Sequence, residues 1–213
     1  MRLLREYIRQ LLTEAAKGPT DLPEGTFVQI RQSGSDVKIS YVDKKGEDFI
    51  DNLTHREGRD PLIPYGEILI EKPNAEGAPG GWKMGQCGDA WMVGYSEAAH
   101  GWGPLLYDVA MEYATLNGGG MIADRTGISG EAQGGWNYYL GKRGDVMDYQ
   151  LDDLMNTLTP DIEEDNCEQA VAGWHPETES GTGTWVESPL SKRYTKPPTT
   201  IRQLDQLGRL IEL

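Results

Sequence analysis

Cysteine, phenylalanine and long apolar runs are scarce in this sequence. Its 213 residues include two cysteines and two phenylalanines. Cys87 and Cys167 are far apart and form no CxxC or Cys/His metal pattern, so we expect a reduced chain, with a single disulfide as the alternative. No apolar run approaches the roughly 20 residues that cross a bilayer, and the first residues are too polar for a secretory signal. We therefore expect a chain that is neither secreted nor membrane-spanning.

Basic residues are too few to balance the acidic ones. The 20 Lys and Arg stand against 34 Asp and Glu, which gives a net charge of −14 at pH 7. A chain this negative repels phosphate, so we expect no nucleic-acid partner and no membrane partner. Residues 144–191 contain no Lys or Arg and carry most of the excess charge. We interpret that segment as a solvated acidic surface, with an adaptor or inhibitor that mimics nucleic-acid charge as an alternative.

Metal binding has little support in the sequence. His55, His100 and His175 lack the spacing of metal ligands. The acids between 152 and 165 lack the alternating oxygen ligands and the glycine of an EF-hand loop. The sequence therefore predicts no metal site.

What the sequence does contain is a succession of helical and strand periodicities. Apolar residues at helical spacing predict helices over 1–17, 104–116, 129–142, 148–156, 163–170 and from 200 to the end of the chain. Alternating or short apolar runs predict a hairpin and three further strands, over 26–31, 37–41, 67–71, 90–93 and 121–123. A linker is expected over 20–25 and a loop over 175–191.

These elements imply an α/β protein. Strand, helix, strand and helix alternate between 90 and 142, which is typical of a βαβα unit in a mixed or parallel sheet. We expect a basic amphipathic helix over 1–17, an α/β domain over 18–158, and an acidic extension with a C-terminal helix over 159–213.

The most informative stretch is the turn between the strand at 90–93 and the helix at 104–116. It consists of Gly101, Trp102, Gly103 and Pro104. Unpaired N–H groups at a helix start and the positive end of the helix dipole favour an anion. Pro104 suits the first helical position, where its missing N–H costs nothing. We predict that these four residues bind the pyrophosphate of a cofactor.

This region resembles the GNAT acetyltransferase superfamily over roughly residues 86–150. In that superfamily a Q/R-x-x-G-x-G/A turn binds acetyl-CoA, and Gly101 and Gly103 match its two small positions. Ala132 matches the alanine of the downstream N-x-x-A-x-x-x-Y segment. The resemblance implies a mixed, mostly antiparallel central sheet flanked by helices, here with helical appendages at both ends. It also implies acetyl-CoA as cofactor and an amine as acyl acceptor.

Three positions depart from the superfamily pattern. Ala98 stands where Gln or Arg is usual, Ser129 where Asn is usual, and Trp136 where the Tyr is expected. The superfamily's Tyr usually protonates the departing thiolate, which an indole cannot do. The resemblance therefore implies that Tyr138 or Tyr139, on the same predicted helix, takes that role.

Two side chains near the turn are candidate general bases. Glu97 follows the strand and His100 lies in the turn. Either would accept a proton from the substrate amine, directly or through water. The alternative for both is a surface or capping role.

The N-terminal segment resembles another class of protein. Leu12-Thr-Glu14 before Ala15, and Leu22-Pro-Glu24 before Gly25, have the form of the prohead-protease sites of large tailed phages. Those proteases trim capsid-targeting helices from proteins packed in the head. The resemblance implies a phage protein found in the virion head or in the host cytoplasm, with capsid or core proteins as partners.

Two functions from different classes follow. The first is an acetyltransferase that modifies an amine on a host protein or a small molecule. The second is an inactive GNAT-like structural or internal virion protein that docks through its terminal helices.

Overall fold

The computed structural model describes residues 16–46, 65–72, 87–123, 128, 130–141, 143–152, 161 and 185–212. The helices expected over 163–170 and over nearly all of 1–17 lie outside these residues. So does most of the loop expected over 175–191.

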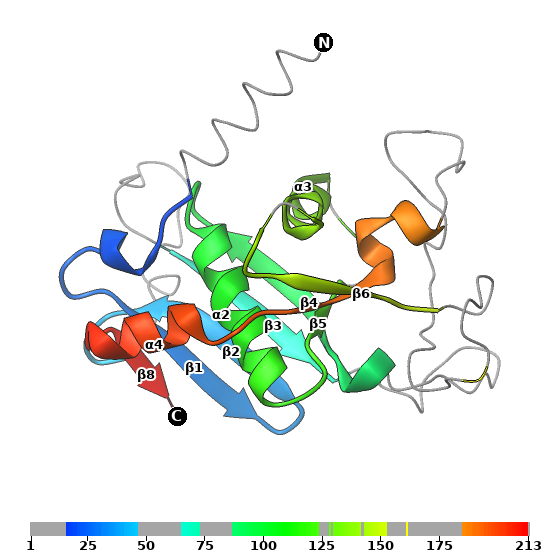
Figure 1. Ribbon diagram of the computed structural model, residues 1–213. Helices are drawn as coiled ribbons and strands as arrows, with labels where there is room; N and C mark the ends of the chain where they lie inside the picture. The colour runs from blue at the N-terminus through cyan, green and yellow to red at the C-terminus, as the bar shows by residue number, and fades with distance from the viewer. Residues whose placement is uncertain are drawn as a thin grey trace, which may run out of the picture. The chain divides into compact units, whose positions relative to one another are not determined.

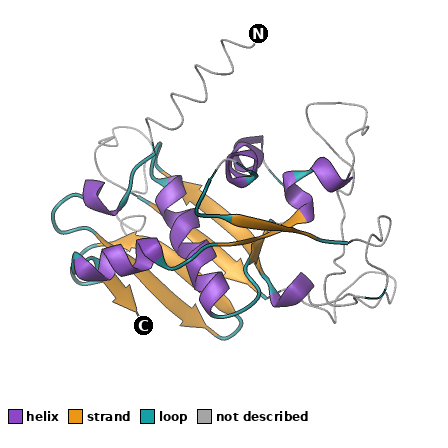
Figure 2. Cartoon of the chain, viewed as in Figure 1, coloured by secondary structure: helices purple, strands orange, loops and turns teal. Residues whose placement is uncertain are grey.

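The described strands form one mixed sheet, drawn as arrows in Figure 1 and in orange in Figure 2. They are β1 (Phe27–Ser33), β2 (Asp36–Val42), β3 (Gly66–Glu71), β4 (Trp91–Ala98), β5 (Met121–Ile122), β6 (Met147–Gln150), β7 (Lys192–Thr195) and β8 (Leu210–Glu212). Their order across the sheet is β6-β7-β5-β4-β3-β2-β1-β8. β1 and β8 pair in parallel, as do β4 and β5, whereas β1–β2, β5–β7 and β6–β7 are antiparallel.

Three α-helices accompany the strands in the described part of the chain. They are α2 (Gly103–Leu116), α3 (Gly130–Tyr139) and α4 (Thr199–Gln206). Single 3₁₀ turns are η1 (Pro19–Asp21), η2 (Cys87–Asp89), η5 (Trp185–Glu187) and η6 (Pro189–Ser191). The expected α/β class is therefore confirmed. None of these helices has the length and apolar character that a membrane span requires.

The chain divides into two compact units, and β3, β4 and α2 each pass from one to the other. The first unit contains residues 1–69, 95–110 and 199–213. Its hairpin of β1 and β2 buries the apolar side chains of Val28, Ile30, Val37 and Ile39, and Gln29 and Ser40 are buried as well. These four apolar residues alternate along their strands in the period-two pattern that predicted the hairpin.

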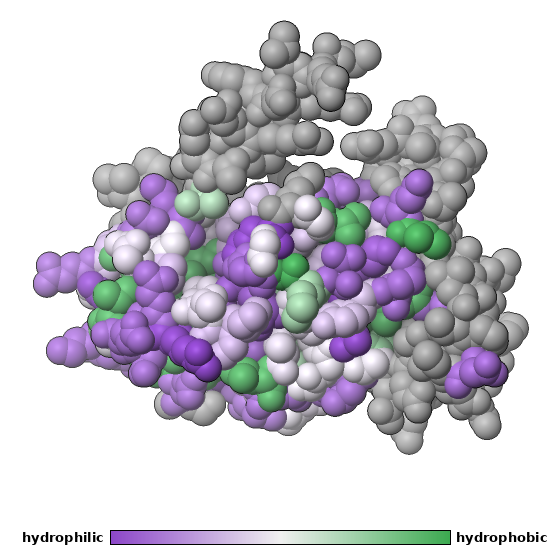
Figure 3. Space-filling model, viewed as in Figure 1, coloured by the Kyte–Doolittle hydropathy of each residue, from purple (hydrophilic) through white to green (hydrophobic). Residues whose placement is uncertain are grey.

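The second unit contains residues 70–94 and 111–198. Its fully buried side chains come from the end of α2, from β5, α3 and β7, and include Met111, Met121, Trp136 and Tyr194. The ring of Trp136 stacks on that of Tyr194, with centroids 5.1 Å apart. On the face shown in Figure 3, hydrophilic and hydrophobic residues are interspersed over the described part of the chain.

Three predictions about the second half of the chain are wrong. Residues 147–150 form strand β6, paired with β7, where a helix was expected from 148. The last helix ends at Gln206, because Gly208 adopts a left-handed φ of +63° and breaks it. Leu210–Glu212 then pairs in parallel with β1. Residues 159–213 are therefore not an appendage, because they supply β7 and β8 to the sheet.

The expected linker over 20–25 is also wrong. Leu22 is 7% exposed, and η1 packs against α4. The guanidinium of Arg209 donates hydrogen bonds to the carbonyls of Pro23 (3.1 Å) and Thr26 (3.0 Å) and lies over the Phe27 ring. Long-range contacts thus hold a stretch whose composition resembles that of a linker.

The expectation of a reduced chain is corrected as well. Cys87 is disulfide-bonded. The other cysteine of the sequence, Cys167, lies outside the described residues.

Candidate functional site

The glycine turn of the first unit adopts a tightly bonded geometry. Gly101 has a left-handed φ of +82°, which favours glycine. The N–H of Trp102 donates to the carbonyl of Ala99 at 3.0 Å, so this N–H is not free for a ligand. α2 begins at Gly103, and its first turn contains no acidic residue. The first N–H groups of α2 have no carbonyl within the helix to bond.

Trp102 lies in the core of the first unit. Its side chain is 3% exposed and meets the Tyr41 ring edge-on, with centroids 5.6 Å apart. The phenol of Tyr41 donates to the Trp102 carbonyl at 2.7 Å. Burial raises the pKa of Tyr41, and Asp108 raises it further. The Trp102 side chain therefore anchors the turn in the core, and its contact with a cofactor stays a prediction.

Two backbone hydrogen bonds also hold the turn in place. Lys17 N–H donates to the Gly101 carbonyl at 2.8 Å, and Ala99 N–H donates to the Tyr65 carbonyl at 2.9 Å. The contact from Lys17 matters for charge, because the sequence between Lys83 and Arg125 contains no Lys or Arg. The backbone of the exposed Lys17 therefore lies beside a turn whose own segment of the sequence has no Lys or Arg.

Strand β4 extends beyond its partner β5. Within the described residues, β5 pairs with β4 only through Trp91–Met121 and Met92–Ile122. β4 continues to Ala98. Among the described residues, no strand therefore pairs with β4 along 93–98 on the edge that faces away from β3. An uncovered edge presents N–H and C=O groups to an extended ligand.

The end of β4 carries polar groups on both faces. Tyr95 and Glu97, two residues apart and so on the same face, are joined by a hydrogen bond of 2.6 Å from the phenol to the carboxylate. Ser96, on the other face, lies 2.9 Å from the Tyr107 hydroxyl on α2. Tyr95 and Ser96 are exposed, whereas Glu97 and Tyr107 are half-buried. The predicted base Glu97 therefore lies on the uncovered strand, and His100 is exposed in the turn.

The predicted acids on α3 belong to the second unit. Tyr139 is 2% exposed, and the Arg143 guanidinium lies over its ring and that of Tyr138, at 5.6 and 5.7 Å. The Tyr138 ring meets that of Tyr139 edge-on, and Trp136 is 1% exposed. The side chains of Trp136 and Tyr139 are packed in the protein. Of the two tyrosines that the resemblance implies as proton donors, the half-buried Tyr138 is therefore the more accessible.

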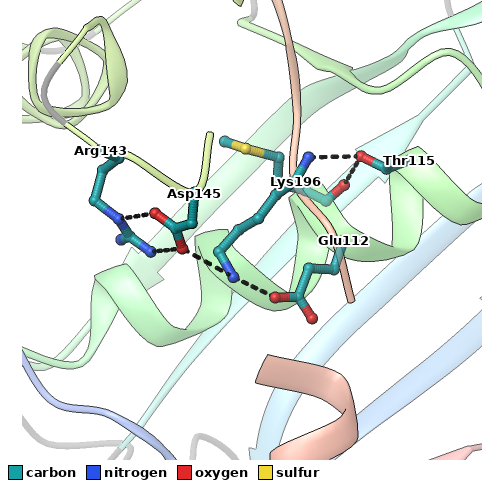
Figure 4. A network of polar contacts seen from close by, with 6 residues as sticks. Glu112, Thr115, Arg143, Asp145 and Lys196 are labelled. Atoms are coloured by element: carbon teal, nitrogen blue, oxygen red, sulfur yellow. Dashed lines mark hydrogen bonds and ion pairs between the residues drawn. The ribbon is translucent and has the colours of Figure 1, made fainter. Parts of the chain in front are cut away.

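A second polar cluster lies within the second unit (Figure 4). The Lys196 ammonium is paired with the Glu112 carboxylate, and the two side chains are 1% and 0% exposed. It also lies 3.4 Å from the Asp145 carboxylate, which accepts two hydrogen bonds from Arg143, at 2.7 and 2.6 Å. The Arg143 hydrogen bonds are the main reason that the pKa of Asp145 falls to about 2. The charges of the four groups balance, so this cluster is best explained as a structural clamp.

The glycine triplet after α2 has a structural role that the sequence did not show. A Cβ on Gly119 would lie 1.6 Å from the Gly88 carbonyl oxygen. The N–H of Gly119 donates a hydrogen bond to the Asp89 carbonyl at 2.8 Å, and the Lys72 ammonium donates to the same carbonyl at 2.8 Å. Cys87, Gly88 and Asp89 all have positive φ. Because Gly119 has no side chain, the backbone at Gly88 and Asp89 can pack directly against it. The triplet therefore has this packing role besides ending α2.

The chain matches no model of a known protein family, no curated protein and no solved structure. In the described residues, no group of three or more His, Cys, Asp or Glu side chains is placed to hold a metal ion.

The sequence brought out the turn and Glu97 but missed Lys17, Ser96 and Tyr107. Lys17 is far from the turn in the chain, so no local pattern links them. Tyr107 occupies a helical face position, and its pairing with a serine on β4 depends on how α2 packs. The lack of Lys and Arg between 83 and 125 is a sequence signal that could have suggested a cation from another segment.

Proposed function

We propose that the chain is a GNAT-like acetyltransferase that binds acetyl-CoA along β4 and at the turn, and transfers the acetyl group to an amine. One observation carries the proposal: the uncovered edge of β4 leads through the Gly101 turn directly into α2. An extended ligand with a charged end suits this arrangement. Its amide groups would bond the strand edge, and its phosphates would meet the N–H groups at the helix start.

Several residues of the first unit support an anion at the turn. The first turn of α2 has no carboxylate to repel phosphate. The backbone N–H of Lys17 bonds the Gly101 carbonyl, so the exposed Lys17 side chain would supply the positive charge that Ala98 cannot supply at the usual Gln or Arg position. Acetyl-CoA would supply the activated acyl group. Glu97, on the uncovered strand, would accept the proton that the acceptor amine loses.

Titration calorimetry with CoA and acetyl-CoA tests the cofactor site. The Gly103→Asp variant should lose binding, because a carboxylate would stand where phosphate binds. A Cβ on Gly103 would lie 3.8 Å from the Ala98 Cβ, which is an ordinary van der Waals contact. An acid in the first turn also favours the helix, so the fold should persist.

The matched control is Gly134→Asp, because Gly134 is an exposed helical glycine with open space around it. It should bind like the parent protein. Lys17→Ala should weaken CoA binding with a reduced salt dependence. Absence of CoA binding at millimolar concentration, or equal binding by Gly103→Asp, would contradict the proposal. Binding without acetyl transfer to any of a panel of amines would contradict its catalytic part.

A further inference from the structure

Asn117 follows the last residue of α2, and Gly118 begins the glycine triplet after it. No other asparagine in the sequence is followed by glycine. Asn117 is exposed and Gly118 is half-buried. The Asn-Gly step is chemically labile in water, because the backbone nitrogen of the glycine attacks the side-chain amide carbon of the asparagine. A glycine has no Cβ to hinder that attack.

The backbone nitrogen of Gly118 is the nucleophile of this step, and its N–H donates no hydrogen bond among the described residues. The N–H groups on either side are bonded. Asn117 N–H donates to the Tyr113 carbonyl at 3.0 Å, and Gly119 N–H donates to the Asp89 carbonyl at 2.8 Å. A hydrogen bond to a carbonyl holds the proton that the attacking nitrogen must lose. The Gly118 nitrogen is therefore less restrained than the nitrogens beside it.

Packing explains why a glycine follows Asn117. A Cβ at position 118 would lie 2.7 Å from the Asp89 carbonyl oxygen, 2.7 Å from the Lys72 ammonium and 3.0 Å from the Trp91 indole nitrogen. These close approaches exclude a larger residue from the folded protein. The same requirement leaves the Asn117 amide without the steric protection that a side chain at position 118 would give.

The Asn117 side chain lies at the end of a helix, where local opening is easiest. Its amide nitrogen donates to the Tyr113 carbonyl at 3.0 Å, and its backbone carbonyl accepts a hydrogen bond from the Trp91 indole at 3.4 Å. Helix ends fray at little cost in free energy, so the bond to Tyr113 opens without unfolding the rest of α2. The amide carbon can then reach the nitrogen of the next residue.

We propose that Asn117 is a self-modification site, which converts to aspartate and isoaspartate through a cyclic succinimide. The Gly118 nitrogen forms a bond to Cγ of Asn117. The bond from Cγ to the side-chain nitrogen breaks, and that nitrogen takes the backbone proton and leaves as ammonia. Water then adds to one of the two ring carbonyls and opens the ring. One opening gives aspartate, and the other gives isoaspartate, whose main chain runs through the former side chain.

Both products disturb the end of α2. A carboxylate cannot donate to the Tyr113 carbonyl, and it adds a negative charge at the negative end of the helix dipole. Isoaspartate also lengthens the main chain just before Gly119, which packs closely against the Gly88 carbonyl. The converted protein should therefore melt at a lower temperature than the fresh protein.

Incubation of the full chain in mildly alkaline buffer made with heavy-oxygen water tests the proposal. Mass spectrometry of peptides should show that Asn117 loses its amide nitrogen and gains one heavy oxygen. A protein isoaspartyl methyltransferase should label the same peptide. The control in the same sample is Asn137, which lies on α3 and precedes Tyr138. It should keep its amide over the same time.

Two variants separate the chemistry from its consequence. Asn117→Gln keeps an amide but closes a ring much more slowly, so it should abolish the labelling. Asn117→Asp adds the charge without the longer main chain, so it should melt between the fresh and the fully converted protein. Conversion of Asn117 no faster than that of Asn137, or labelling that persists in Asn117→Gln, would overturn the proposal. Because the parent protein itself gives the mass readout, the test does not depend on the folding of a variant.

Discussion

The ammonium of Lys196 and the carboxylate of Glu112 form an ion pair that is almost completely removed from water, with the side chains 1% and 0% exposed. Breaking such a pair leaves a buried charge without its partner, which typically costs about 3–5 kcal/mol. Lys196 follows β7 and Glu112 lies on α2, so the pair links two elements that are distant in the chain. The backbone N–H of Lys196 adds a hydrogen bond to the Thr115 hydroxyl at 3.0 Å (Figure 4).

Replacing Lys196 alone by Met should therefore lower the free energy of unfolding by about 3 kcal/mol or more. The double variant Lys196→Met with Glu112→Leu should recover most of that loss, because no charge remains buried. Urea unfolding followed by tryptophan fluorescence measures both variants. Equal stability of the single and double variants would contradict the account of Lys196 and Glu112 as a coupled pair.

The Asp145 carboxylate should make the stability depend on acid pH. Its pKa is lowered from 3.8 to about 2, first by hydrogen bonds from Arg143. A group with a depressed folded-state pKa contributes its stability above its unfolded pKa and loses it as the pH falls through the folded value. Between pH 4 and pH 2 the parent protein should lose more stability than Asp145→Asn. Since the carboxylate is 38% exposed, the difference should stay below about 1 kcal/mol.

Urea unfolding in steps from pH 5 to pH 2 detects this difference. Asp205→Asn, which removes an exposed carboxylate on α4, serves as the control and should follow the parent protein. Parallel pH curves for Asp145→Asn and the parent protein would be inconsistent with the Arg143 interaction.

Gly119 should not tolerate even a methyl group. An added Cβ would lie 1.6 Å from the Gly88 carbonyl oxygen, so one of the two backbone segments must move. We expect Gly119→Ala to destabilise the protein by at least about 3 kcal/mol. Gly134→Ala, in an exposed helical position with open space, should stabilise it by about 0.5–1 kcal/mol. Thermal unfolding of the two variants is the measurement, and a mild effect at Gly119 would argue against the close approach.

The two sequences near the N-terminus that resemble prohead-protease cleavage sites should differ in how readily they are cleaved. At Glu24–Gly25 the preceding Leu22 is 7% exposed, the Pro23 carbonyl accepts a hydrogen bond from Arg209, and Gly25 has a φ of +82°. A protease binds its substrate extended, so this site requires local unfolding first. If the chain is processed in a phage head, its new N-terminus should be Ala15 and not Gly25.

Mass spectrometry of the protein from purified particles identifies that N-terminus. Arg209→Ala, which releases the Pro23 carbonyl, should raise any cleavage at Gly25. A mature parent protein that begins at Gly25 would refute the claim that the folded segment is protected.

Local patterns predicted much of the first unit. The hairpin of β1 and β2 follows from side-chain alternation, and α2 from an apolar stripe with Pro104 at its start. The turn at Gly101 was predictable because the conformational freedom of glycine and the start of a helix depend on only a few neighbouring residues. Where a long-range contact competed with propensity, prediction failed, as at β6 and at the segment 20–25.

By itself, the sequence determined the α/β class, the strand–turn–helix at Gly101 and the absence of any nearby Lys or Arg. Only the tertiary structure decided that Lys17 meets the Gly101 carbonyl, that Ser96 pairs with Tyr107, and that the last residues form β8 beside β1. The physical reason is the range of the forces involved. Capping, turn conformation and periodicity depend on neighbouring residues, whereas strand pairing and buried ion pairs depend on segments that only folding brings together.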